Sequence, residues 1–521
     1  MSPGEAGDDL TWLASELSAI RRELLPTEES RVLHLALDQG GSSSRAVLFD
    51  AVGREVGSAH VPIDTRRSGD RVEHDADELA QSLVTAARDA CDLPLAAGRP
   101  VIVAGLATQR STVCCWDATD GAALAPAISW QDRRHAAWLA ATLGDRAEWV
   151  RELTGLPLSP HYGASKLRWC LDELPEVRLA LRDERLAMGP LASFLLHRLC
   201  EERPLCVDPA NASRTLLYDP AVLDWSAPLL EAFGLPRSVL PRCVGTVHPF
   251  GTLTLDEHRR VPLRACSGDQ SAAVFAFGTP TADTCFVNIG TGAFVQRIAR
   301  DRTSAAPRGL LRSVVHAHTH DLQGATYVHE GTVNGALAAV EWLRARVGLD
   351  VPRTLATLRQ SLRSDQVELL FMNGVGGLGA PYWLPSFPVE FVALDGTPPR
   401  AAALGELQQM AAVVDSIAFL VAVNVEGLHR AAPLERLVVT GGLASCDYLC
   451  EVLAEVTGLE VARPALREAT ARGIAFLAAG QPGHWQSVPV ERSFTRAGRA
   501  RVHDRYARWR EEMAKRGAGW K

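Results

Sequence analysis

Residues Leu35–Asp50, LALDQGGSSSRAVLFD, give the first indication of the fold. The apolar segments LALD and RAVLF are typical of neighbouring strands, and the QGGSSS between them is typical of a tight turn. Glycines let main-chain N–H groups approach a polyanion, and the serine hydroxyls and Arg45 add further donors. Asp38 ends the first segment and is a candidate for holding hydrated Mg²⁺ beside phosphates. The stretch alone fits an ordinary β-hairpin equally well, because Gly and Ser dominate turns.

The residues that follow continue the strand pattern and then alternate with helices. REVGSAHV (54–61) predicts a third strand of an antiparallel meander. ADELAQSLVTAARDACDL (76–93) has helical periodicity, and PVIVAGLATQ (100–109) and STVCCWDATDG (111–121) have the apolar composition of buried strands. This alternation predicts the α/β class.

The pattern of strand, glycine turn and strand then returns, which indicates a distant internal repeat. TCFVNIGTGAFVQRI (284–298) has this form, and LERLVVTGGLASCDYLCEVLAEVTG (434–458) reads as strand, glycine turn and helix. Neither the P-loop pattern nor the dinucleotide-binding GxGxxG pattern occurs in these turns. Three glycine turns spread over two halves predict a two-lobed cleft in which each lobe binds part of ATP.

The length of 521 residues predicts two large domains. We expect an N-terminal extension over 1–32, an N-terminal domain over 33–262, a C-terminal domain over 263–500 and a tail over 501–521. The extension is expected to be helical and docked on the domain surface or on a partner subunit, since apolar residues recur at helical spacing at Leu13, Leu17, Ile20 and Leu24.

Composition narrows the partners and the compartment. A net charge of −7 argues against nucleic acid as the main partner. The eleven cysteines include no CxxC spacing, which predicts buried thiols in a reducing cytoplasm rather than disulfides or a zinc site. No apolar run is expected to reach the roughly 20 residues that span a bilayer. A homo-oligomer, either a dimer or a tetramer, is possible.

Ser267-Gly268-Asp269-Gln270 predicts the start of a helix, with Asp269 in its first turn. The helix dipole would keep this carboxylate ionised, and an ionised carboxylate can take the proton from an attacking hydroxyl. The alternative is a helix-capping aspartate, which local sequence alone favours.

Together these segments resemble the FGGY carbohydrate kinase family, and within it the glycerol kinases, from about residue 33 to about residue 480. The segments occur in the family's order, and that order is far more specific than any one of them. They are DQGGSSSRA (38–46), GLATQRSTVCCWD (105–117), AISWQDRR (127–134), GASKLRWCLDE (163–173), VDPANASRTLLYD (207–219), SGDQSAAVF (267–275), NIGTGAFV (288–295), GLGAPYW (377–383) and TGGLASCDYLCEVLAEVTGLEVARP (440–464).

The resemblance implies two actin-like (ribonuclease H-like) domains flanking a cleft for ATP and substrate. It implies ATP- and Mg²⁺-dependent phosphorylation of a hydroxyl on a small polyol or sugar, with Asp269 as general base and Asp38 as the magnesium-linked acid. By motif position the nucleotide contacts are Gly40, Gly41, Ser42, Ser43, Arg45, Gly290, Thr291, Gly292, Gly441, Gly442 and Ser445. The acceptor contacts are Arg110, Ser111, Trp130, His161, Asp269 and Gln270.

Several positions depart from the glycerol pattern. Ser111 replaces the glutamate that follows the arginine, His161 replaces a tyrosine, and Gly41 replaces a threonine. The stretch over 384–404 is also altered. The hypothesis is therefore that glycerol is a poor acceptor and that a four- or five-carbon polyol or ketose is better. The alternative is an ordinary glycerol kinase whose pocket is completed by Tyr162 or ordered water.

Each acceptor residue also has a purely structural interpretation. Trp130 suits a core indole, Arg110 a surface ion pair, and His161 a structural or surface histidine. A non-catalytic ATP or sugar sensor on the same fold is the competing class of function, and a chaperone-type ATPase is a second. The retention of Asp38 and Asp269 disfavours the sensor, and the acceptor segments disfavour the chaperone.

Overall fold

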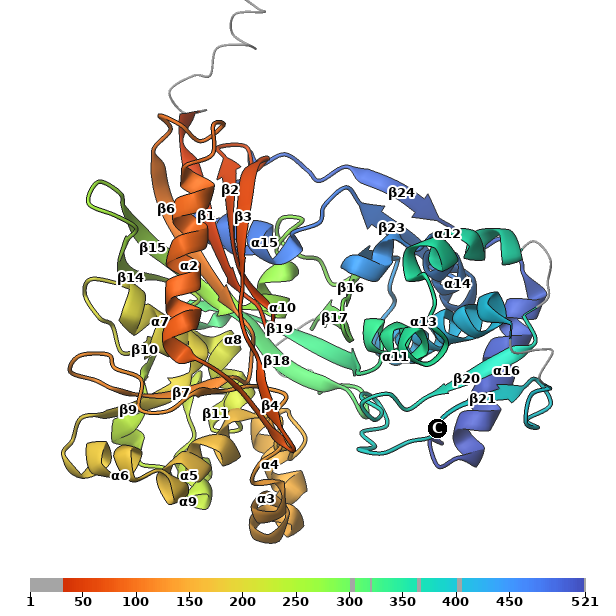
Figure 1. Cartoon of the computed structure of the whole chain (residues 1–521), viewed down its shortest axis with the longest axis horizontal. Coiled ribbons are helices and arrows are strands. Elements are labelled where there is room, and N and C mark those ends of the chain that lie inside the picture. Colours follow the sequence, from red (N-terminus) through yellow and green to blue (C-terminus); the bar gives the residue numbers. More distant parts are fainter. Residues whose placement is uncertain (1–30, 300–304, 319–320, 363–366, 401–404, 520–521) are drawn as a thin grey trace, which may run out of the picture.

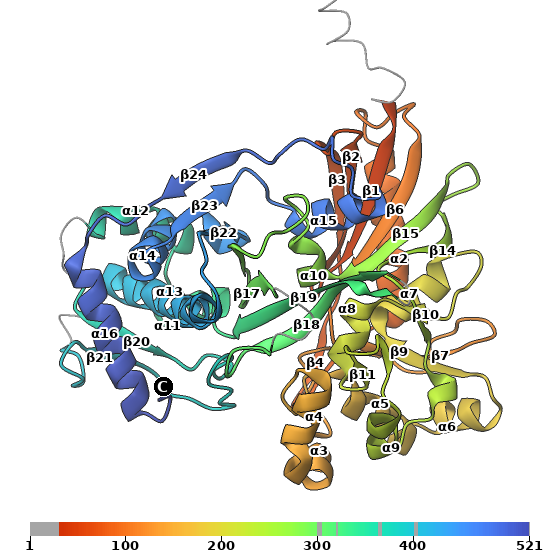
Figure 2. The ribbon, with the colours of Figure 1, turned by 180° about the vertical axis from the view of Figure 1, so that it is seen from behind.

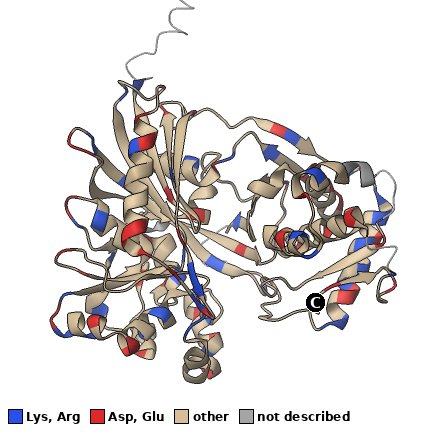
Figure 3. Cartoon of the chain, in the orientation of Figure 1, with Lys and Arg blue, Asp and Glu red and all other residues tan. Residues whose placement is uncertain are grey.

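The chain folds into two lobes that meet along a central joint (Figures 1 and 2). The computed structural model describes residues 31–299, 305–318, 321–362, 367–400 and 405–519. The helix predicted over residues 1–32 therefore lies outside the described residues, apart from its last two positions. Basic and acidic residues are interspersed along the ribbon of both lobes (Figure 3).

The first lobe is built on a six-stranded sheet with the order β14-β15-β6-β1-β2-β3. The predicted meander is confirmed, because β1, β2 and β3 pair antiparallel. β6 and β15 run parallel to β1, so the carboxyl ends of three strands lie at one edge of the sheet. The strands are β1 (Leu33–Gln39), β2 (Ser43–Asp50), β3 (Glu55–Pro62), β6 (Val101–Thr108), β14 (Val247–Thr254) and β15 (Arg260–Gly268).

Two helices pack on this sheet. α2 (Ala76–Cys91), as predicted from its periodicity, contacts β1, β2 and β3. α15 (Ala469–Ala478), from the far end of the chain, packs against β1, β6 and β15. The approach of α15 is close, since a Cβ atom built on Gly105 would lie 2.8 Å from the carbonyl oxygen of Ile474.

A second layer completes the first lobe. A five-stranded sheet has the order β4-β5-β8-β7-β9, and several short helices belong to the same lobe. Its strands are β4 (Arg66–Ser68), β5 (Arg71–His74), β7 (Val113–Asp117), β8 (Ala127–Ile128) and β9 (Leu186–Pro190). The helices are α3 (Ala136–Leu143), α4 (Ala147–Thr154), α5 (Gly163–Glu173), α6 (Pro175–Arg182), α7 (Leu191–Leu199), α8 (Pro209–Ala212) and α9 (Ala227–Phe233). Two small ladders pair β10 (Cys206–Val207) with β13 (Arg242–Cys243), and β11 (Tyr218–Asp219) with β12 (Asp224–Trp225).

The second lobe repeats the first sheet, and the internal repeat is thereby confirmed. Its sheet has the order β18-β19-β17-β16-β22-β23-β24. The run β19-β17-β16-β22-β23 matches β3-β2-β1-β6-β15 in order and in strand direction. These strands are β16 (Thr284–Ile289), β17 (Ala293–Ile298), β18 (Leu311–His318), β19 (Asp321–Val333), β22 (Arg436–Thr440), β23 (Glu460–Pro464) and β24 (Val490–Phe494).

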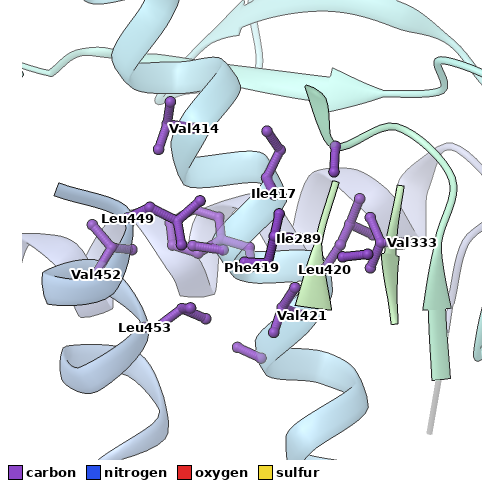
Figure 4. Close-up of a cluster of buried hydrophobic side chains, with 14 of the residues drawn as sticks. Ile289, Val333, Val414, Ile417, Phe419, Leu420, Val421, Leu449, Val452 and Leu453 are labelled. Carbon is purple, nitrogen blue, oxygen red and sulfur yellow. The ribbon is translucent and has the colours of Figure 1, made fainter. Parts of the chain in front are cut away.

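The core of the second lobe forms around α13 (Glu406–Ala431), which packs against α14 (Asp447–Thr457) and β20 (Leu369–Asn373) (Figure 4). α11 (Leu337–Val347) and α12 (Val351–Leu362) also contact α13, and β21 (Val389–Ala393) pairs with β20. Contrary to our expectation of no such run, α13 is long and apolar enough to cross a membrane. Its most apolar 18-residue window is 94% buried, as is typical of a core helix.

Two predicted boundaries differ from the structure. β15 crosses the division expected between residues 262 and 263, and its pairing with β6 keeps its last residues in the first sheet. The segment expected to be a tail is mostly the helix α16 (Ala500–Lys515), which buries Trp509 and Met513 in the core of the second lobe. Apolar residues recur at helical spacing along α16, so one face of this helix packs into the core instead of remaining exposed as a tail would.

The eleven cysteines are free thiols, as predicted. Ten are buried, and Cys91 is half-buried. They serve as small apolar core residues in both lobes.

Candidate active site

Three of the predicted site residues meet where parallel strands of the first sheet end. Asp38 lies near the end of β1, Arg110 lies just beyond β6, and Asp269 follows β15 directly. Since β1, β6 and β15 are neighbours in the sheet, residues far apart in sequence reach one place. Ligands of open α/β sheets bind at such carboxyl edges.

Asp269 opens the short helix α10 (Asp269–Ala273), as the sequence predicts. Its Oδ1 accepts the main-chain N–H of Gln270 at 2.7 Å and lies 3.7 Å from Nε of Arg110. The expectation that the helix dipole keeps this group ionised is incomplete, because burial outweighs the neighbouring guanidinium and raises the pKa of Asp269 above its ordinary value. A higher pKa makes the carboxylate a stronger proton acceptor.

Asp38 is buried and incompletely paired. Among the described residues its Oδ1 has no hydrogen-bond partner, and its Oδ2 lies 3.8 Å from Nη1 of Arg45. Burial and then the negative charge of Asp269 raise the pKa of Asp38 to about 7. A buried carboxylate oxygen without a donor is a suitable ligand for a hard cation such as Mg²⁺ or for its water shell.

The turn after β1 presents only part of its main chain to a ligand. The N–H of Gly40 donates to the carbonyl of Ser43 at 3.0 Å, so this group closes the turn. Gly41, Ser42 and Arg45 are exposed. A Cβ atom on Gly41 would lie 3.8 Å from Nε1 of Trp130, so the turn adjoins the predicted acceptor residues.

The two glycine turns of the second lobe lie side by side, because β16 and β22 are parallel neighbours. The turn at Gly290–Gly292 is held by the start of α11, whose first N–H groups donate to the carbonyls of Gly290 and Thr291. Gly441 has a φ of +90°, and a Cβ atom there would lie 2.5 Å from Oδ1 of Asn288. A Cβ atom on Gly442 would meet open space. The hydroxyl of Ser445 donates a hydrogen bond to the carbonyl oxygen of Gly442 at 2.9 Å.

The predicted acceptor residues lie together in the first lobe. The rings of Trp130 and His161 meet edge to face with centroids 5.6 Å apart. Burial, followed by the charges of Lys166 and nearby arginines, lowers the pKa of His161 well below its usual value, so the imidazole is neutral at pH 7. Ser111 is 2% exposed, has a φ of +66°, and its Oγ has no partner among the described residues.

A buried carboxylate that the sequence did not single out holds the acceptor arginine. Glu330, on β19, accepts hydrogen bonds from Nη1 of Arg110 at 3.0 Å, from Nη2 of Arg214 at 2.6 Å and from the amide of Gln296 at 2.7 Å. Burial alone would raise the pKa of Glu330, but the two guanidinium groups outweigh it and lower that pKa to about 2. The surface ion pair considered for Arg110 is therefore wrong, since this pair is buried.

Several contacts among the described residues join the lobes at the site, including the pairing of Glu330 with Arg214. The Glu330–Arg110 pair links β19 to the end of β6, and Nδ2 of Asn288 donates to Oε1 of Gln270 at 3.1 Å. A further contact that the sequence missed is Phe294, whose ring lies 5.3 Å from the guanidinium carbon of Arg110. The one signal in the sequence that could have indicated Glu330 is the position of this acid inside the otherwise apolar strand segment YVHEGTV (327–333).

Known proteins share this architecture and sequence. Residues 33–276 match the N-terminal domain of the FGGY family of carbohydrate kinases, and residues 285–481 match its C-terminal domain. The chain belongs to the FGGY family of carbohydrate kinases. The resemblance predicted from the motifs is thus confirmed, and the chain is an ATP-dependent kinase that transfers a phosphoryl group to a carbohydrate or polyol hydroxyl.

Individual relatives lie in the same family. The chain is 35% identical to a glycerol kinase of Bordetella parapertussis over 93% of this chain and 97% of the relative. It is 33% identical to one of Methylibium petroleiphilum over 91% and 97%. Similar solved structures include a Plasmodium falciparum glycerol kinase with ADP, at a TM-score of 0.82 and 21% identity. A Brucella ovis xylulose kinase has a TM-score of 0.79 and 21% identity. Each of these two matches covers 93% of this chain and 98% of the solved chain. The predicted fold of two actin-like domains is confirmed.

Proposed function

We propose that this FGGY kinase phosphorylates a four- or five-carbon polyol or ketose in preference to glycerol. The observation that carries the proposal is Ser111, a short side chain beside Arg110 whose buried hydroxyl has no partner among the described residues. A buried hydroxyl without a partner loses about 1–3 kcal/mol relative to a paired one. An additional hydroxyl on a longer acceptor would satisfy Ser111 and occupy the space that a glutamate would fill.

The geometry supports separate roles for the site residues in proton transfer and in binding of the acceptor. Asp269 takes the proton from the attacking hydroxyl as the bond to the γ-phosphorus forms, and ADP leaves with the electrons of the broken P–O bond. Arg110 and the neutral His161 bind hydroxyls of the acceptor, while Trp130 covers its carbon face. Gln270 would bind the acceptor beside the base, and its bond to Asn288 ties it to the second lobe.

The nucleotide roles follow from the turns. The exposed turn residues Gly41, Ser42 and Arg45 face phosphates from the first lobe, together with Ser43 at the start of β2. The turns Gly290–Gly292 and Gly441–Ser445 bind phosphates and adenosine from the second. Mg²⁺ fits beside Asp38, whose Oδ1 is free of donors among the described residues, and it would neutralise charge on the phosphates when bound.

An ordinary glycerol kinase is the second candidate. It is favoured by Tyr162, which is 3% exposed and lies within hydrogen-bonding reach of Arg214 in the Glu330 cluster. A phenol at that place is a second way to complete a pocket for a short acceptor. The curated relatives named glycerol kinase point in the same direction.

The deciding measurement is kcat/KM for glycerol against erythritol, the pentitols, xylulose and ribulose. A charged hydrogen bond is worth about 1.5–3 kcal/mol, so loss of the glutamate at position 111 should weaken glycerol by roughly 10- to 150-fold. We expect at least one longer acceptor to exceed glycerol. A tenfold advantage for glycerol over every longer acceptor would leave the second candidate standing.

The double variant Ser111→Glu with His161→Tyr tests the pocket directly. It should raise glycerol activity relative to the longer acceptors. An unchanged ratio would mean that neither position contacts the acceptor.

A cytoplasmic location is also proposed, supported by the free thiols of all eleven cysteines.

A further inference from the structure

Lys166, on α5, is a fully buried lysine beside the acceptor residues. It has 0% exposure, and both hydrogen bonds described for its ammonium group go to main-chain carbonyl oxygens. Nζ lies 3.1 Å from the carbonyl oxygen of Ser111 and 2.7 Å from that of His161. One side chain therefore joins two of the positions at which this chain departs from the glycerol pattern.

Packing of α5 against β7 brings together the two segments that Lys166 joins, and Lys166 adds a direct link between their main chains. Ser111 lies between β6 and β7 in a left-handed conformation with a φ of +66°, which costs a non-glycine residue of order 1 kcal/mol or more. His161 lies in the segment before α5, on a different part of the chain. An external donor to the carbonyl of each residue fixes both segments relative to α5.

The environment of Lys166 makes a purely structural role costly. Burying an ammonium group away from water carries a penalty of several kcal/mol, which an apolar side chain of the same length would avoid. Burial, followed by the charge of Arg133, lowers the pKa of Lys166 well below its usual value. Either protonation state of the amine still provides hydrogens for two carbonyl oxygens.

We propose that Lys166 is a positioning residue that sets the spacing of Ser111 and His161 and thereby the affinity and selectivity for the acceptor. This inference rests on the proposed function, because it assumes that both residues face the acceptor. Lys166 itself does not touch the reacting atoms. Misplacement of a binding group by about 1 Å costs on the order of 10²-fold, so loss of this link should be visible in acceptor kinetics.

The test compares Lys166→Met with wild type, using the acceptor that the wild-type enzyme prefers. Methionine keeps the length and removes both hydrogen bonds. We expect KM for the acceptor to rise about 10- to 100-fold, while KM for ATP changes less than about twofold. The differences in kcat/KM between the preferred acceptor and the other acceptors should also become smaller. Lys166→Gln, which retains two N–H donors on a shorter side chain, should recover part of the loss and replaces Lys166→Met if that variant does not fold.

A matched control separates positioning from stability. Leu171→Ala removes buried volume from the same helix, so it should lower the unfolding temperature without changing the ratio of KM values for acceptor and ATP. An unchanged acceptor KM in Lys166→Met, or equal rises in both KM values, would overturn the inference and leave the proposed function intact. A wild-type enzyme that phosphorylates no acceptor on the panel would overturn both.

Discussion

At the scale of single residues, the proposed general base Asp269 directly follows β15 and lies 3.7 Å from Nε of Arg110. Asp269→Asn should fold and bind ATP but lose about 10²- to 10⁴-fold in kcat, the usual cost of removing a general base. Asp145 offers a matched control, since Asp145→Asn removes the same charge from an exposed position that is not among the predicted site residues. Retention of more than about half of the wild-type kcat would exclude Asp269 as the base.

Asp38 gives a second prediction at this scale. Asp38→Ala removes the buried oxygen that lacks a donor, so the enzyme should require a higher Mg²⁺ concentration for half-maximal rate. Titration of activity with Mg²⁺ at fixed ATP measures this shift. An unchanged Mg²⁺ requirement together with an unchanged rate would place the metal elsewhere.

The sequence pointed to these two acids because Asp38 precedes a glycine-rich turn after a recognisable strand and Asp269 lies in the first turn of a predicted helix, while the family resemblance implied their roles. It did not predict the partner of Arg110. Glu330 is 220 positions away from Arg110 and 116 from Arg214. Local pattern contains no information about contacts at that separation, which arise only when β19 reaches the first lobe. The sequence did not single out Lys166 for a similar reason, since its proposed role depends on hydrogen bonds to main-chain carbonyl groups, which every residue carries.

At the scale of elements, the adjacent turns after β16 and β22 allow the nucleotide site to be tested with two neighbouring glycines. Gly441→Ala should cost about 1–3 kcal/mol of stability, because its φ is +90° and a Cβ atom would collide with Asn288. Gly442→Ala should leave the unfolding temperature unchanged, because its Cβ would meet open space.

The kinetic comparison of the two variants locates the adenosine. If the nucleotide lies against this turn, Gly442→Ala raises KM for ATP without a loss of stability. An unchanged KM for ATP in both variants would mean that this turn does not contact the nucleotide.

The strands that carry these turns were predicted correctly, because strand, glycine turn and strand form a continuous local pattern. The division between domains was harder to place, since β15 is the second strand of the β14–β15 hairpin in the first sheet and no change of composition marks its end.

At the scale of the whole molecule, the two lobes are joined by a long hairpin. β18 and β19 belong to the sheet of the second lobe, yet Val314 and Tyr327 pack in an apolar cluster formed mainly by first-lobe residues. Glu330 lies on β19 of the same hairpin and pairs with Arg110 and Arg214 of the first lobe. Arg110, which we propose as an acceptor-binding residue, is thus held by a residue of the opposite lobe.

This arrangement predicts a pH-dependent contribution of Glu330 to stability. The pKa of Glu330 in the folded protein is about 2, below its ordinary value of 4.5. Its ionised form is therefore stabilised by folding, and the contribution is fully present above about pH 4.5 and is lost as pH falls toward about 2. A shift of this size corresponds to about 3 kcal/mol.

Glu330→Gln should lower the free energy of unfolding at pH 7 by about 3–5 kcal/mol, because Arg110 and Arg214 would remain buried without a counter-charge. Glu341→Gln is the matched control, since Glu341 forms an exposed pair with Arg344 in the same lobe and should cost less than about 0.5 kcal/mol. Denaturant unfolding of wild type and both variants from pH 7 down to about pH 3.5 measures the differences. The gap between wild type and Glu330→Gln should begin to close below about pH 4.5, whereas a gap that is small at pH 7 or constant with pH would mean that the charge of Glu330 does not hold the lobes together.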